Sequence, residues 1–118
     1  MSYDYKIFRS TGQLPSSLED LMGSSEPFES YESVKALLSR HSDGVVWNDS
    51  EQAGTLENDI GRFEFQCSDD LLELGMISLR TSFRQDVTAG HDFLRKLCHA
   101  ENMIALDEQT MEIIVATR

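Results

Sequence analysis

Histidines, cysteines and carboxylates are the side chains of this 118-residue chain that could carry chemistry, and metal binding is the first chemistry to test. His91 and His99 are eight positions apart, on roughly one side of a predicted helix but two turns from each other, with Asp92 and Cys98 nearby. Zinc sites normally contain tight pairs such as Cys-x2-Cys or His-x3-His, and the chain has neither. The spacing favours ordinary helix-surface histidines, and we predict no metal site and no cofactor.

A cysteine nucleophile activated by a histidine is the second possibility. Cys67 ends an alternating run in which it shares the inward face with Phe63 and Phe65, and buried thiols are more often packing residues than reactive ones. The chain has no Gly-x-Ser-x-Gly turn and no glycine-rich phosphate loop. The adjacent Asp69 and Asp70 are typical of solvated carboxylates in a turn. We therefore predict a protein without enzymatic activity.

The charge balance is the most unusual property of the sequence. Twenty-one acidic residues against ten Lys and Arg give a formal net charge of −11. Binding to a phosphate backbone needs Lys and Arg to displace counterions, and an anionic membrane surface would repel this chain. We therefore expect neither a nucleic acid nor a membrane as partner, whereas the charge favours a basic protein.

Basic residues balance the acidic ones least in the stretch between Thr11 and Gly61. Between Thr11 and Gly61 there are ten acidic and two basic residues, whereas six of the ten basic residues follow Gly61. One end or face of the molecule should therefore be strongly negative. Two interpretations stay open, because such a face can serve solubility alone or can be directed at a cationic site on another protein.

The second interpretation identifies candidate partner-binding residues in two loops, residues 23–29 and 48–59. These candidates share an acidic side chain in a polar, irregular stretch, and they are Glu26, Glu29, Asp49, Glu51, Glu57 and Asp59. Phe28, Tyr31 or Trp47 could act as exposed aromatic anchors beside them, unless these rings pack into the core.

Apolar periodicity predicts the elements that must position these residues. Alternation predicts strands at residues 3–9, 62–67 and 74–81, and a shorter strand at 45–47. Ser16 and Glu19 have capping-box spacing for a short helix that ends at Gly23. Two longer helices cover residues 33–41 and 89–101, and residues 103–106 and 111–115 form a closing hairpin. Residues 48–61 are predicted as a long loop or ragged strand, and residues 68–70 as a turn.

The predicted fold class is α+β, because strands that follow one another directly favour antiparallel pairing. We expect a single domain, residues 1–118, with a single antiparallel β-sheet of five or six strands and two main helices and one short helix packed on it. The predicted core residues are Phe63, Phe65, Ile77, Leu79, Leu94, Leu97, Leu37 and Leu38. Without a signal-peptide pattern or a long apolar run, we expect a cytoplasmic protein with both cysteines reduced.

The two ends of the chain carry recognisable motifs. Near the start, Tyr3-Asp4-Tyr5-x-Ile7-Phe8-Arg9 is followed by Leu14-Pro15-x-Ser17-Leu18-Glu19-Asp20-Leu21. The ending reads Leu97-Cys98-x-x-x-Asn102-x-Ile104-Ala105-Leu106-Asp107-x-Gln109-Thr110-x-Glu112-Ile113-Ile114. These motifs resemble a set of small proteobacterial proteins that are similar in character to the immunity proteins of interbacterial toxin systems, including type VI secretion. The motifs are structural, so the resemblance implies no catalytic residue.

The resemblance and the charge together predict an immunity-type inhibitor that neutralises a cognate toxin or effector by direct protein–protein binding. Toxins that attack nucleic acids tend to have a basic active-site cleft, and an acidic inhibitor would occupy that cleft in place of phosphate. The alternative is a small self-associating adaptor or housekeeping domain, a homodimer formed through an exposed sheet edge.

Overall fold

The structure, a computed structural model of the chain, describes residues 2–9, 27–41, 44–83, 87–101, 103–110 and 112–114. The predicted short helix at residues 16–23 lies outside these residues, as does the candidate Glu26. None of the helices in these ranges is long and apolar enough to cross a membrane.

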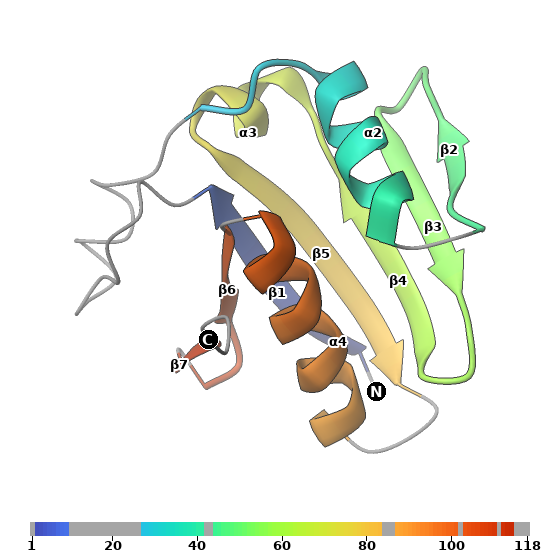
Figure 1. Cartoon of the computed structure of the whole chain (residues 1–118), viewed down its shortest axis with the longest axis vertical. Coiled ribbons are helices and arrows are strands. Elements are labelled where there is room, and N and C mark those ends of the chain that lie inside the picture. Colours follow the sequence, from blue (N-terminus) through green and yellow to red (C-terminus); the bar gives the residue numbers. More distant parts are fainter. Residues whose placement is uncertain are drawn as a thin grey trace.

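One antiparallel sheet organises the molecule, as the α+β prediction requires (Figure 1). Its strands are β1 (Ser2–Arg9), β2 (Val46–Asn48), β3 (Ala53–Glu57), β4 (Gly61–Gln66), β5 (Met76–Phe83), β6 (Met103–Asp107) and β7 (Glu112–Ile114). Their order across the sheet is β2-β3-β4-β5-β1-β6-β7. We expected five or six strands, and the sheet has seven hydrogen-bonded segments. The two outermost segments, β2 and β7, have only three residues each.

Three helices accompany the sheet in the described part of the chain: α2 (Tyr31–His41), α3 (Asp69–Glu73) and α4 (Val87–Glu101). The two longer helices lie on the same face of the sheet, and α3 lies at one end of it (Figure 1). The predicted helices at residues 33–41 and 89–101 correspond to α2 and α4. The α+β class with two main helices is therefore confirmed.

The short helix α3 corrects the prediction of a turn at residues 68–70. Ser68 is the extended residue before the helix, and its carbonyl accepts a hydrogen bond from the Leu72 N–H at 3.0 Å. Leu72 is buried, with 3% of its surface exposed. A single helical turn lets this leucine reach the core while Asp69 and Asp70 stay in solvent, and burial of the leucine favours the helix over an open turn.

The core lies between the sheet and the two long helices. Alternate residues of the strands point toward the helices, so Phe63 and Phe65 of β4 are fully buried while Arg62 and Gln66 are exposed. Seven of the eight predicted core residues are buried, and Leu37 is partly buried at the edge of the cluster. A second buried cluster of Phe8, Met76, Ile104 and Leu106 belongs to the alternate strand positions.

Strand β3 occupies the stretch that was predicted as a loop or ragged strand. Its sequence, Ala-Gly-Thr-Leu-Glu, has weak strand propensity, and the strand is stabilised by pairing with β2 and β4 on its two sides. Gly54 is required here because the indole ring of Trp47 lies directly on it. A Cβ atom at this position would be 2.7 Å from Cε3 and Cζ3 of that ring.

Candidate protein-binding surface

Exposed carboxylates from three separate elements gather at one end of the sheet, at the top of Figure 1. These elements are the start of α2, the turn between β2 and β3, and the short helix α3. We call this surface the acidic end, and its members are Glu29, Glu32, Asp49, Glu51, Asp69, Asp70 and Glu73. All seven side chains belong to exposed residues.

Hydrogen bonds between the three elements hold the acidic end together. The Phe28 N–H donates to the Leu72 carbonyl at 2.9 Å, which joins the residues before α2 to α3. Nε2 of the Gln52 side chain donates to Oδ1 of Asp69 at 3.1 Å, which joins the β2–β3 turn to α3. Residues separated by up to 45 positions in the sequence are therefore fixed as one surface (from Phe28 to Glu73).

Asp49 has a structural as well as a surface role within the acidic end. Its Oδ1 accepts hydrogen bonds from Nζ of Lys35 and from the hydroxyl of Tyr31, both at 2.8 Å. The bond from Lys35, and then the bond from Tyr31, lower the pKa of Asp49 below its ordinary value. The same contact raises the pKa of Lys35. This carboxylate therefore fastens the β2–β3 turn to α2 and keeps its charge under mildly acidic conditions.

The aromatic residues suggested as anchors are packing residues to different degrees. Phe28 and Tyr31 are 6% and 8% exposed and belong to the main core, so they are not the exposed anchors that the sequence allowed. Trp47 is partly buried and meets the Tyr31 ring edge-on, with 5.9 Å between ring centroids. Of these three rings, only Trp47 offers a surface to a partner.

The six predicted site residues do not form one patch. Glu29, Asp49 and Glu51 belong to the acidic end, whereas Glu57 and Asp59 lie at the opposite end of β3 (Figure 1). The four residue steps from Ala53 to Glu57 correspond to about 14 Å of extended chain. Glu57 also lies 3.5 Å from Nη1 of Arg62. The β2–β3 hairpin therefore carries carboxylates at both of its ends.

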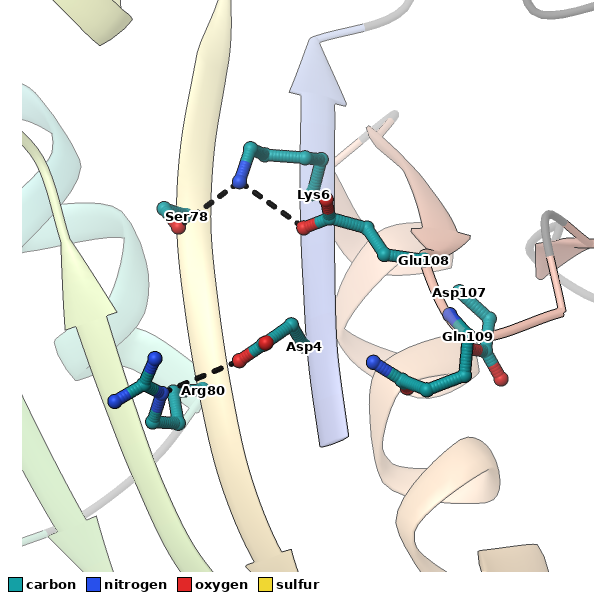
Figure 2. Close-up of polar contacts among 7 residues, drawn as sticks. All are labelled: Asp4, Lys6, Ser78, Arg80, Asp107, Glu108 and Gln109. Carbon is teal, nitrogen blue, oxygen red and sulfur yellow. Dashed lines mark hydrogen bonds and ion pairs between the residues drawn. The ribbon is translucent and has the colours of Figure 1, made fainter. Parts of the chain in front are cut away.

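The face of the sheet away from α2 and α4 carries a different arrangement of charge, shown in Figure 2. Nζ of Lys6 donates to Oγ of Ser78 at 3.2 Å and lies 3.0 Å from Oε1 of Glu108. On the same two strands, Nε of Arg80 lies 3.3 Å from Oδ1 of Asp4. These residues line a shallow depression of about 250 Å³. We call the exposed part of this face of the sheet, on the side away from α2 and α4, the open face.

The described residues hold no group of three His, Cys, Asp or Glu side chains that could bind a metal ion. Cys67 and Cys98 are both buried and free, and burial raises the pKa of each thiol to about 12. Thiols with such pKa values remain protonated at neutral pH and are poor nucleophiles.

Two polar clusters, one part-buried and one exposed, were missed from the sequence, and both connect a helix to another element. Nε2 of His91 on α4 lies 3.1 Å from the Tyr5 hydroxyl and 3.6 Å from Oδ2 of Asp107. Glu101 at the end of α4 lies 2.8 Å from Nη2 of Arg40 and 2.5 Å from Nε2 of His41. The contacts of Tyr5 with His91, and of Arg40 and His41 with Glu101, join residues at least 60 positions apart, so only the topology could have identified them.

Comparisons with protein-family models, curated proteins and solved structures find no match to this chain. The acidic end, the sheet edge beside it and the open face are therefore the observations from which a function must be inferred.

Proposed function

We propose that this chain is a non-enzymatic, immunity-type inhibitor that neutralises a cognate bacterial toxin in the cytoplasm by direct protein–protein binding. The observation that supports the proposal is the acidic end, where three elements bring seven exposed carboxylates together. A surface of this kind is complementary to a basic active-site cleft. It would attract such a cleft at long range and form desolvated carboxylate–arginine pairs on contact.

The acidic end is largely preformed, which favours tight binding. Asp49 is held by Tyr31 and Lys35, and the β2–β3 turn is held to α3 by Gln52. A preformed surface loses less conformational entropy on association than a flexible loop with the same charges. Lys35 and Arg9 are the basic side chains whose described contacts reach this end, the first at Asp49 and the second at the Pro27 carbonyl.

The test is co-purification with the product of the adjacent gene, followed by titration of charge-reversal variants at two salt concentrations. Glu51→Lys and Asp70→Lys should each weaken binding by about tenfold or more if they face the partner, since close charge pairs at interfaces couple by about 1.5–7 kcal/mol. Asp92→Lys is the matched control, because it makes the same change of charge at an exposed position of α4, away from the acidic end. Binding by the parent protein should weaken as salt rises.

If the adjacent gene product is not retained, or if neither salt nor any reversal changes its binding, the acidic end serves solubility only. The alternative function is then a self-associating domain. The observation that favours this alternative is the sheet edge at β2, where Val46 is 72% exposed. A sedimentation experiment at micromolar concentration separates the two functions, because the inhibitor should be a monomer without its toxin.

A further inference from the structure

Strand β2 is the outermost strand on one side of the sheet, and its described partner is β3 alone. The direction of its backbone groups follows from the neighbouring ladder. In that ladder the Cys67 N–H donates to the Gln52 carbonyl at 2.9 Å, and the Asn58 N–H donates to the Gly61 carbonyl at 3.0 Å. Even-numbered residues from 52 to 58 therefore direct their backbone groups toward β4, and odd-numbered residues direct theirs toward β2.

The same alternation determines the outer edge of β2. Val46 and Asn48 stand opposite Thr55 and Ala53, so their backbone groups face β3. The N–H and C=O of Trp47 consequently point away from the sheet. A strand placed along this edge could exchange two backbone hydrogen bonds with Trp47, as directly opposed residues of an antiparallel pair do.

The edge is accessible and rigid. Natural sheet edges are often protected by Lys, Pro or a bulge, and the three residues of β2 include neither Lys nor Pro. Val46 is 72% exposed on the open face, where a residue of an added strand could pack against it. Trp47 is fixed from the other side by Gly54 and Tyr31, so its backbone needs little rearrangement to accept a partner strand.

The charges around this edge select the occupant. Asp49 and Glu51 follow β2 at one end of the hairpin, where Lys35 pairs with Asp49, and Glu57 and Asp59 lie at the other end, where Arg62 lies 3.5 Å from Glu57. At each end two carboxylates therefore lie beside one described basic side chain. Two copies of this chain paired along β2 would bring these carboxylates against those of the second copy, and a strand with basic residues would meet opposite charge. Complementarity therefore favours a basic strand over a second copy.

We propose that the outer edge of β2 binds an extended, basic segment of a partner protein by adding a strand to the sheet. The segment pairs with the backbone of Trp47, packs an apolar side chain on Val46 and places Lys or Arg near each end of the hairpin. Because the hairpin ends are about 14 Å apart, the two basic positions should be separated by about four to six residues. This inference rests on the proposed function, since it names how the toxin would be held.

The test uses a synthetic peptide, Lys-Val-Thr-Val-Thr-Val-Lys, with blocked ends. Trp47 is the single tryptophan of the chain, so its fluorescence reports binding at the edge. Backbone amide exchange at Trp47 should slow by about tenfold or more in the complex. Two further peptides carry N-methyl groups at alternate backbone nitrogens, one peptide for each of the two possible sets. The peptide methylated at the nitrogens that face the edge should bind about tenfold more weakly, because it cannot donate hydrogen bonds to β2. A peptide with Glu in place of Lys should not bind.

Variants of the protein separate strand addition from general charge attraction. Val46→Asn keeps the net charge and should weaken binding of the basic peptide by about fivefold or more, because asparagine has low strand propensity and offers no apolar contact. Val46→Thr keeps a β-branched residue and should bind within about twofold of the parent protein. Equal binding of all N-methylated peptides, or unchanged exchange at Trp47, would overturn the proposal. Equal binding of the Glu peptide would overturn the basic occupant.

These outcomes are distinguishable from failure of the proposed function. If the adjacent gene product binds but protection at Trp47 does not change, the inhibitor stands and strand addition is wrong. If the peptide binds at the edge but no toxin is retained, strand addition stands and the inhibitor is wrong. A dimer without peptide that protects Trp47 and is disrupted by Val46→Asn would identify a second copy as the occupant and overturn the proposal.

Discussion

The open face and the acidic end arrange their charges in opposite ways. On the open face each described charge has a partner on a neighbouring strand or turn: Lys6 with Glu108, Arg80 with Asp4, and Arg62 with both Glu57 and Glu64. At the acidic end seven exposed carboxylates come from three neighbouring elements, Lys35 lies near Asp49 and Glu32, and Arg9 donates to the Pro27 carbonyl. The excess negative charge is thus unevenly distributed.

This difference distinguishes charges that the fold explains from charges that it does not. Cross-strand pairs on the open face support the register of the sheet. Glu32, Asp69 and Asp70 lie in the first turns of α2 and α3, where acidic side chains interact favourably with the helix dipole. Neither explanation covers Glu51 or Glu73, which add to the repulsion within the acidic end. Their presence is the better indication of a binding role.

The largest effect is expected in the core beneath both surfaces. Phe65→Ala should reduce the free energy of unfolding by about 3–5 kcal/mol, because it removes a fully buried ring and leaves a cavity. Gln66→Ala, the next residue on the same strand, faces solvent and should change it by about 0.5 kcal/mol or less. Urea denaturation measures both values, and similar values for the two variants would contradict the assignment of faces.

This pair of residues also shows what the sequence could and could not predict. Alternation in β4 and the apolar stripes of α2 and α4 identified their buried faces, because a periodic pattern directly reports which side is covered. Strand β3 was predicted only as one of two alternatives, a long loop or a ragged strand, because Gly54 weakens its pattern, and the glycine is explained by the contact with Trp47. The acidic end required the contacts of Phe28 and Gln52 with α3, which no local pattern encodes.

A smaller effect should distinguish the two charged surfaces directly. Arg80 stands between Asp4 on β1 and Glu64 on β4. Arg80→Glu would place three carboxylates side by side across three strands and should cost about 1 kcal/mol of stability at low salt. Glu51→Lys reverses a charge at the acidic end and should leave stability unchanged or slightly higher, because it reduces repulsion. Loss of stability in both variants, measured by urea denaturation, would remove the distinction between the surfaces.

The smallest effect concerns Asp49, whose hydrogen bonds from Lys35 and Tyr31 lower its pKa. Because its pKa is lower in the folded protein than in the unfolded chain, its ionisation stabilises the fold fully above the unfolded value, about 3.9. That contribution is lost as the pH falls through the lower, folded value. Asp49→Asn should therefore have a lower urea midpoint than the parent protein at pH 7, and the difference should shrink as the pH falls below about 4.

The matched control for this pH dependence is Glu51→Gln, which removes a charge from the same turn but no bond to Lys35 or Tyr31. Its difference from the parent protein should not follow the pattern of Asp49→Asn, because only Asp49 fastens the turn to α2. If both variants show the same pH dependence, the stabilisation comes from the total charge of the turn. In that case the hydrogen bonds of Asp49 do not fix the β2–β3 turn. The acidic end would then have no entropic advantage in binding from a preformed turn.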